Sequence, residues 1–475
     1  MVFSSVTFLF FYLPLVLFVY ALISDRRRNL FILLASLIFY SWGETFYVLV
    51  MLASILTNYF FGLLIGNFAE NDRPRGAKFA LTLAIVANLA LLGTFKYTSF
   101  LVGNLNLLLS TFNSSEMDIP AVHLPIGISF FTFQAVSYLI DVYRKEVDAE
   151  KSLINLGLYI SLFPQLIAGP IVRFRDIAEQ IHTRTHSTRM AYHGSLRFCF
   201  GMAKKVLIAN PLGELADQLF GLGAAEMSPG MAWLAVAAYT LQIYFDFSAY
   251  SDMAIGLGKI FGFKYRENFN YPYVSQSITE FWRRWHISLS SWFRDYLYIP
   301  LGGNRAGSMR TYLNLFIVFF LCGLWHGASW NFVIWGLYNG VFLVWERSFF
   351  GAMLPRIPRV IRHLYLVVTV MVGWVFFRTE TLDEAIGVLA AMFYVGEVNY
   401  PLGVESFVTS KIIFIFMLAV VFSAPVYRTM FRLEAEEDIS GRFLPLQVIL
   451  ALTLLGLSSI FLAAGSYNPF IYFRF

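Results

Sequence analysis

Long apolar runs, separated by short charged segments, recur along the whole chain. Most runs have the length of about 20 residues that a helix needs to cross a bilayer. They lie near 6–23, 30–49, 50–67, 79–95, 122–140, 153–171, 193–210, 231–250, 312–330, 331–345, 360–377, 411–426 and 443–464. No run alternates apolar and polar residues at every second position, so the spans are expected to be helices. The pattern predicts an all-α polytopic membrane protein with about 11 or 12 crossings plus re-entrant or interfacial helices.

Composition agrees with this pattern. Of the 475 residues, 58% are hydrophobic and only 14% are charged, whereas soluble domains carry roughly 25% charged residues. The net charge of +5 is explained by basic loops and requires no nucleic acid. Cys199 and Cys322 lie in apolar runs without metal-ligand spacing, so we expect buried thiols and no metal site. With no repeat and no long linker, residues 1–475 are expected to form one membrane domain.

The charged loops give an orientation. Arg26, Arg27 and Arg28 follow the first run, so this loop is expected in the cytoplasm and the N-terminus outside. Further basic loops are expected on the cytoplasmic side. The loops 113–120, 221–230 and 396–406 carry acidic residues without Lys or Arg, so they are expected outside. The final span, 443–464, leaves a basic loop. The C-terminal tail, 465–475, is therefore expected on the extracytoplasmic side.

His326 lies in the segment Leu324-Trp325-His326-Gly327, inside an apolar run from 312 to 345 that contains no charged residue. A histidine in such a run is costly to bury and is by default a functional hypothesis. Gly323 and Gly327 leave room for another backbone or a ligand beside the ring. The alternative is a core histidine that is hydrogen-bonded to a neighbouring helix.

Residues 277–296 combine tryptophan with arginine. On a helical wheel, one face carries Phe281, Trp285, Leu289, Trp292 and Tyr296, and the opposite face carries Arg283, His286, Ser290 and Arg294. One interpretation is an anchor helix at the membrane–water boundary. The other is a funnel on the cytoplasmic side whose arginines bind the phosphates of a nucleotide-bearing donor.

Two carboxylates, Asp246 and Asp252, lie in or beside a span. Intramembrane carboxylates normally pair or line a wet cavity, and the candidate partners are Arg283, Arg284 or a histidine. Structural pairing is favoured over direct catalysis.

The segment 163–173 contains Pro164, Gly169 and Pro170 at membrane depth. These residues predict a broken helix, which inside membranes lines a cavity. The simpler alternative is a kink.

Taken together, these blocks resemble the membrane-bound O-acyltransferase (MBOAT) family, and in particular its bacterial branch that O-acetylates alginate. The resemblance rests on residues 1–5, 124–130, 168–170, 246–258, 281–286, 301–305 and 324–327. It implies a bowl of tilted helices around a central transmembrane tunnel. The signature histidine of the family matches His326, flanked by Trp325 and Gly327, and a second, less uniform histidine matches His286. The implied donor is cytoplasmic acetyl-CoA, with no permanently bound cofactor.

The tail ends in Phe470-Ile471-Tyr472-Phe473-Arg474-Phe475. Its composition alone favours an interfacial anchor. It also resembles the C-terminal motif of the small single-span partner in the teichoic acid system, in which the tyrosine is thought to carry the acyl group. Tyr472 is therefore a candidate acyl relay, and both interpretations stay open.

The resemblance implies an O-acetyltransferase of the bacterial cytoplasmic membrane. His326 would be the general base and Tyr472 the first acceptor, while His286 would orient the donor or polarise its thioester. The donor phosphates would be bound by Arg283, Arg284 and Arg294. A periplasmic SGNH-type or esterase-like transferase would then pass the acetyl group to a polysaccharide such as alginate. The alternatives are a transporter that makes no bond and a scaffold for a periplasmic complex.

Overall fold

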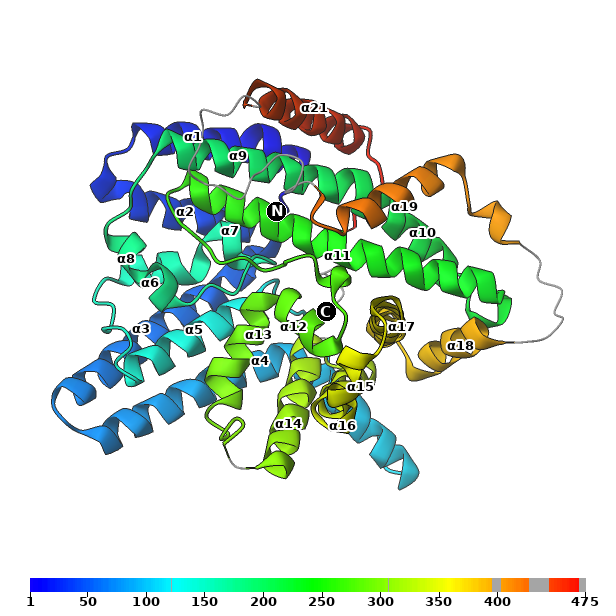
Figure 1. The fold of residues 1–475 in the computed structure, drawn as a ribbon. Coiled ribbons are helices and arrows are strands. Elements are labelled where there is room, and N and C mark those ends of the chain that lie inside the picture. The colour runs from blue at the N-terminus through cyan, green and yellow to red at the C-terminus, as the bar shows by residue number, and fades with distance from the viewer. Residues whose placement is uncertain (121, 306, 395–402, 427–443, 470–475) are drawn as a thin grey trace. The chain divides into compact units, whose positions relative to one another are not determined.

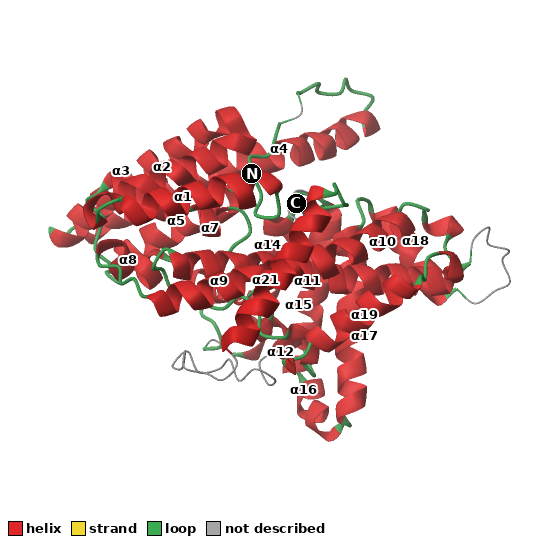
Figure 2. Cartoon of the chain, turned by 90° about the horizontal axis from the view of Figure 1, so that it is seen from above, coloured by secondary structure: helices red, strands yellow, loops and turns green. Residues whose placement is uncertain are grey.

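A computed structural model describes residues 1–120, 122–305, 307–394, 403–426 and 444–469. Tyr472 lies outside the described residues. Figure 2 shows the described parts as helices joined by loops, without a strand among them. The chain divides into two compact units, Met1–Gly194 with Leu257–Arg266, and Ser195–Gly256 with Glu267–Phe475. The expected single membrane domain stays a prediction.

Five helical segments are long and apolar enough to cross a membrane: Asp25–Glu70, Pro74–Thr111, Ser308–His326, Arg359–Arg378 and Pro445–Ala463. Three shorter apolar segments, Phe8–Leu22, Ile128–Tyr143 and Ser410–Phe422, accompany them. The prediction of an all-α polytopic membrane protein is confirmed. The number of crossings stays a prediction.

The first unit is built mainly from the N-terminal helices. These are η1 (Phe8–Tyr12), α1 (Leu13–Leu22), α2 (Asp25–Glu44), η2 (Thr45–Tyr47), α3 (Val48–Glu70), α4 (Pro74–Thr111), α5 (Ile128–Tyr143), α6 (Leu153–Ser161), α7 (Phe163–Leu166) and α8 (Phe174–His182). Buried rings of Phe8, Tyr12, Phe39 and Phe163 pack at centroid distances of 5.5 to 6.3 Å. These rings supply much of the apolar contact that holds α2 and α7 against the N-terminal segment.

The break predicted around Pro164 is confirmed. Helix α7 ends at Leu166, and the chain is non-helical until Phe174. A Cβ on Gly169 would lie 2.6 Å from the Cα of Gln165, so only glycine fits this turn. Residues 162–174 are all buried, as irregular backbone inside a membrane protein must be.

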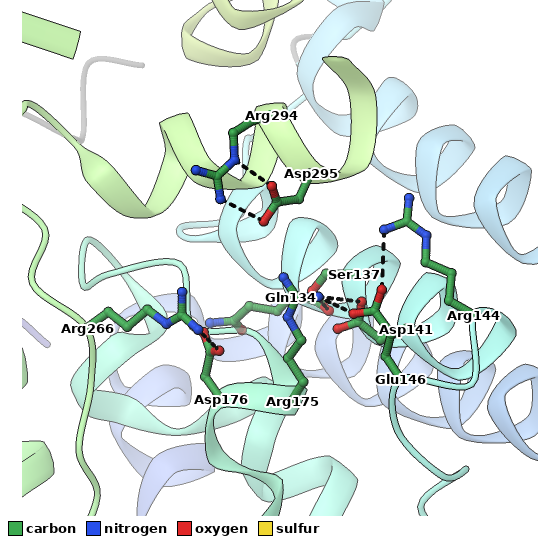
Figure 3. A network of polar contacts seen from close by, with 10 residues as sticks. All are labelled: Gln134, Ser137, Asp141, Arg144, Glu146, Arg175, Asp176, Arg266, Arg294 and Asp295. Atoms are coloured by element: carbon green, nitrogen blue, oxygen red, sulfur yellow. Dashed lines mark hydrogen bonds and ion pairs between the residues drawn. The ribbon is translucent and has the colours of Figure 1, made fainter. Parts of the chain in front are cut away.

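A polar network fixes the end of α5 (Figure 3). Asp141 of α5 is fully buried, and its carboxylate lies 4.0 Å from Arg175 of α8, which also pairs with Glu146. Nearby, Arg266 pairs with Asp176 at 2.6 Å. The ion pairs link α5 and α8 and tie the returning segment 257–266 to α8 within the first unit.

Two helices, α9 (Thr188–Ala203) and α11 (Pro229–Ile260), contribute residues to both units. The second unit continues with η3 (Lys204–Ala209), α10 (Asn210–Phe220), η4 (Ala224–Glu226), η5 (Pro272–Val274), α12 (Ile278–Arg284), α13 (Ile287–Phe293), η6 (Arg294–Tyr298), α14 (Ser308–His326), α15 (Trp330–Arg347), α16 (Phe349–Met353), η7 (Leu354–Arg356), α17 (Arg359–Arg378), α18 (Leu382–Phe393), η8 (Val404–Ser406), α19 (Ser410–Phe422) and α21 (Leu444–Ala463).

Helices α14 and α15 form a tightly packed hairpin, and His326 is the last residue of its first helix. Figure 1 shows them beside α12 and α13, and α15 also packs on α17. A Cβ on Gly323 would lie 2.3 Å from the carbonyl oxygen of Phe332, and one on Gly336 would lie 2.3 Å from that of Phe319. The small residues therefore allow backbone-to-backbone contact between the two helices.

The predicted continuous helix over 277–296 is wrong. The chain forms α12, breaks at Trp285 and His286, and resumes as α13. His286 has a φ of +44° and is fully buried, whereas the wheel had placed it on the polar face. A tertiary hydrogen bond, from the Ser288 backbone N–H to the side chain of Asn268, replaces part of the helical pattern. The predicted apolar face is confirmed, because all five of its residues are buried.

Candidate active site

His326 is the last residue of α14, not a mid-helix residue of one long apolar segment. The chain turns through Gly327 and starts α15 at Trp330. The imidazole is buried among Trp325, Trp335 and Phe377, whose rings lie 4.9, 4.8 and 5.3 Å from it, centroid to centroid. This aromatic cage holds the ring in one orientation.

One hydrogen bond defines the tautomer of His326. Its Nδ1 lies 2.7 Å from the backbone carbonyl oxygen of Cys322, one turn earlier in α14. A carbonyl oxygen can only accept, so Nδ1 carries the hydrogen. In the neutral ring the lone pair is then on Nε2, the atom that can take a proton from an acceptor hydroxyl.

His286 is held in the same way by a different partner. The side-chain oxygen of Asn268 accepts from the backbone N–H of Ser288 at 3.2 Å, which fixes the orientation of the amide. The same oxygen lies 3.1 Å from Nδ1 of His286, so Nδ1 donates to it. His286 Nε2 is buried and makes no hydrogen bond among the described residues. His286 lies outside the candidate spans; burial, and secondly the neighbouring His326, lower its pKa well below the ordinary value.

Trp325 lies next to both histidines. Its ring centroid is 6.2 Å from that of His286 and 4.9 Å from that of His326. Gly327 follows, and a Cβ there would lie 2.1 Å from ring carbons of Phe332. The absence of a side chain at 327 therefore lets Phe332 close against the end of α14. The two histidines predicted from sequence thus meet around one indole.

A cavity of about 860 Å³ opens beside this cluster, a volume in the range of small-molecule sites. Cys322 of α14, whose carbonyl binds His326, lines the cavity. Its remaining lining includes Thr279, Trp282, Arg283, Ser290, Ser291, Arg294, Phe319, Leu343, Glu346 and Arg347. The cavity therefore runs from cationic side chains on α12, η6 and α15 to within one helical turn of the catalytic candidate.

The structure separates the three predicted arginines. Arg283 and Arg294 line the cavity, whereas Arg284 does not and instead binds Glu280 at 3.0 Å and the backbone oxygen of Asn270. Arg294 also pairs with Asp295 at 2.6 Å (Figure 3). Arg347 is a third cavity arginine that sequence reasoning missed. Arg283 and Arg347 form no ion pair with the part of the chain that the structure describes.

The expected partners of the two carboxylates were wrong. Asp246 is buried and pairs with Lys205 at 2.8 Å. Asp252 pairs with Arg197 at 2.8 Å and with Lys204 at 2.6 Å. The structural role predicted for both carboxylates is consistent with these ion pairs, and the partners come from α9 and η3 because those segments pack along α11.

Glu346 was also missed. This buried carboxylate accepts from the backbone N–H groups of Ile278 and Thr279, at 2.5 and 2.8 Å, and from the hydroxyl of Thr279 at 2.6 Å. It caps the start of α12 and thereby positions Arg283. A charged residue at 346, at the end of a long apolar run, was a visible signal, but its partners Ile278 and Thr279 lie 68 and 67 residues away.

The fold and this site define a class of protein: a multi-pass helical membrane protein with two buried histidines beside an arginine-bearing cavity. Residues 77–379 match the sequence profile of MBOAT, the membrane-bound O-acyltransferase family. The chain is 44% identical, over the full length of both proteins, to the probable alginate O-acetylase AlgI of Azotobacter vinelandii. It is 48% identical to the AlgI of Pseudomonas aeruginosa, over 83% of this chain and 75% of that protein. A peptidoglycan O-acetyltransferase of Helicobacter pylori is 33% identical over 100% of this chain and 98% of its own length.

The chain belongs to the membrane-bound O-acyltransferase family. It is therefore an enzyme that transfers an acyl group from a donor, and the transporter alternative is not supported. The resemblance seen in the sequence is confirmed.

Proposed function

We propose that this protein transfers an acetyl group from cytoplasmic acetyl-CoA, across the bacterial inner membrane, for O-acetylation of alginate. The observation that carries the proposal is the orientation of His326, with Nδ1 bound to the Cys322 carbonyl beside the arginine-bearing cavity. The names of the two AlgI relatives support an acetyl group and alginate as the final acceptor. A peptidoglycan acceptor is the second candidate, supported by the more distant relative.

His326 acts as the general base. Its Nε2 removes the proton from an acceptor hydroxyl, and the oxygen attacks the thioester carbonyl carbon of acetyl-CoA. A new C–O bond forms, the C–S bond breaks, and the leaving CoA sulfur takes the proton from the imidazolium. Each cycle therefore returns His326 to its neutral Nδ1–H form.

His286 orients the reactants. Two roles followed from the sequence, orienting the donor or polarising its carbonyl. In the neutral ring, Nδ1 is the donor atom and already binds Asn268, so Nε2 can only accept a hydrogen bond. This tautomer disfavours the polarising role and favours an orienting one.

The cavity receives the donor. Arg283, Arg294 and Arg347 bind the phosphates, since guanidinium groups match phosphate oxygens bidentately. The apolar lining from Trp282 to Phe319 accommodates the pantetheine arm, and the thioester reaches the end of α14 near Cys322. The basic loops of the sequence support a cytoplasmic entrance.

Tyr472 is the first acceptor. Both termini lie on the extracytoplasmic side, and the tail enters the site from there. A separate periplasmic SGNH-type or esterase-like transferase then moves the acetyl group from Tyr472 to the polysaccharide. The charge pattern of the loops and the resemblance of the tail motif support this step.

The test is peptide mass spectrometry after incubation of the purified protein with acetyl-labelled acetyl-CoA. Wild type, His326→Ala and Tyr472→Phe are compared, with CoA release measured in parallel. We expect the label on the C-terminal peptide of the wild type and on neither variant. CoA release by His326→Ala at the wild-type rate would overturn the role of the base. Label transfer to alginate, with the periplasmic transferase added, at the wild-type rate in Tyr472→Phe would overturn the relay.

A further inference from the structure

Three consecutive tail residues contact one stretch of helix in the second unit. The hydroxyl of Tyr467 donates to Asp217, the side-chain oxygen of Asn468 accepts from Asn210 at 3.1 Å, and the carbonyl oxygen of Pro469 accepts from Lys205. We call Lys205, Asn210 and Asp217 the docking strip. None of these contacts was anticipated from the sequence.

The order of the contacts gives the tail a direction. As the tail advances from 467 to 469, its partners step back from 217 to 205, so the tail runs antiparallel to α10 and η3. The next three residues can extend the chain by roughly 10 Å beyond Pro469. The strip therefore holds the described tail up to Pro469, the residue that directly precedes the terminal motif in the sequence.

The inner end of the strip is anchored in the protein interior. Lys205 and its partner Asp246 are both almost completely buried, with side-chain exposures of 3% and 1%. The ion pair neutralises the two charges, and the lysine still donates to the tail. The next residue after Asp246, Phe247, packs its ring 4.6 Å from that of His286. The partner of Lys205 is thus followed in α11 by a residue that packs on His286.

The outer end of the strip, Asp217, is also held in place by neighbouring helices. Asp217 accepts from Arg378 of α17 at 2.7 Å, and the guanidinium of Arg378 lies over the rings of Phe220 and Tyr239, 4.8 and 5.9 Å from their centroids. Residues of α17, α10 and α11 therefore fix the Asp217 carboxylate, which accepts the hydrogen bond from the Tyr467 hydroxyl.

We propose that the docking strip is a positioning site for the C-terminal tail, which holds residues 467–469 so that the terminal motif is presented to His326. Lys205, Asn210 and Asp217 are positioning residues and take no part in the chemistry. The inference rests on the proposed function, because it assigns the strip to delivery of the acceptor tyrosine.

Docking is tested without any activity measurement. Asn210→Cys and Asn468→Cys are combined in a Cys199→Ala, Cys322→Ala background and treated with a short bifunctional methanethiosulfonate. Glu214→Cys with Asn468→Cys is the matched control, since Glu214 is exposed on the same helix and is not a hydrogen-bond partner of the described tail residues 467–469. Yields are normalised to labelling by methyl methanethiosulfonate. We expect cross-linked peptides with 210 and at least fivefold fewer with 214; equal yields would overturn the docking.

Positioning is tested by the rate of acetyl loading onto the tail. Tyr467→Phe combined with Asn210→Ala should lower the rate by at least roughly 30-fold, the effect of losing one charge-assisted and one neutral hydrogen bond, with an unchanged KM for acetyl-CoA. Glu214→Gln should match the wild type. Wild-type loading in the double variant would overturn the positioning role. If Tyr472→Phe shows that the tail carries no acetyl group, the proposed relay fails, whereas the cross-link still decides the docking.

Discussion

The Nδ1 atom of His326 lies 2.7 Å from the carbonyl oxygen of Cys322, so the imidazole donates to its own helix. This carbonyl lies one turn before the end of α14, which includes His326, so it accepts from both the backbone and the side chain of that residue. The end of the helix therefore fixes the tautomer of the catalytic candidate from within α14.

His326→Gln should lower CoA release by at least about 100-fold, because glutamine can donate to the carbonyl but cannot act as a base. The measurement is the rate of thiol release from acetyl-CoA, with thermal unfolding followed beside it. His363→Gln is the control, since His363 is exposed and its Nδ1 lies 3.2 Å from the backbone oxygen of Ser275, away from the cavity lining. Retention of more than a tenth of the wild-type rate would contradict the assignment.

Arg283→Gln combined with Arg347→Gln should raise the KM for acetyl-CoA about tenfold and leave kcat nearly unchanged. The two guanidinium groups line the cavity away from the reacting atoms, so their loss weakens ground-state binding and transition-state binding equally. Initial rates at varied acetyl-CoA decide this. Arg284→Gln should show no such rise in KM. An equal rise in that variant would contradict binding of the donor phosphates in the cavity.

His286→Asn should fold with a melting temperature close to that of the wild type, whereas His286→Val should be clearly destabilised. The backbone φ of +44° is accessible to asparagine and histidine and is strained for a β-branched residue. Thermal unfolding in detergent measures the difference, which should be about 1–3 kcal/mol. Equal stability of the two variants would show that the strained turn relaxes.

Gly336→Ala should destabilise the α14–α15 hairpin, since its new methyl group would lie 2.3 Å from the carbonyl oxygen of Phe319. Overpacking of this kind costs about 1–3 kcal/mol. Gly456→Ala in α21 is the matched control, because a Cβ there would meet no described atom within 4 Å beyond the backbone of its own helix. The free energies of unfolding of the two variants should differ by that amount, and a Gly336→Ala protein as stable as the control would refute the close approach.

Glu346→Ala should cost about 1–3 kcal/mol of stability, because three donors of Ile278 and Thr279 would lose their acceptor. Glu346→Gln keeps one carbonyl oxygen and should recover part of the loss. Chemical denaturation of the purified protein provides the measurement. The prediction fails if alanine and glutamine are equally tolerated.

In the segment 277–296, the sequence predicted which residues are buried but not where the helix breaks. The apolar face was predictable, because burial follows helical spacing within each of α12 and α13. The break at His286 was not, since it depends on Asn268, a partner 18 residues away. The same holds for Asp246, because its partner Lys205 lies 41 residues away and was not among the expected partners.

Local pattern alone predicted the membrane class, its helical character and the broken segment around Pro164, and it singled out His326 as a candidate, because hydrophobic length and the cost of burying a histidine are properties of short stretches. The family followed from ordered motifs. The tautomer of His286, the cap by Glu346 and the docking strip were decided only by the tertiary structure. Each depends on an atom that a segment distant in the sequence brings within hydrogen-bond distance, and no local pattern encodes that proximity. The tautomer of His326 depends instead on its own helix, which had first to be seen to end at that residue.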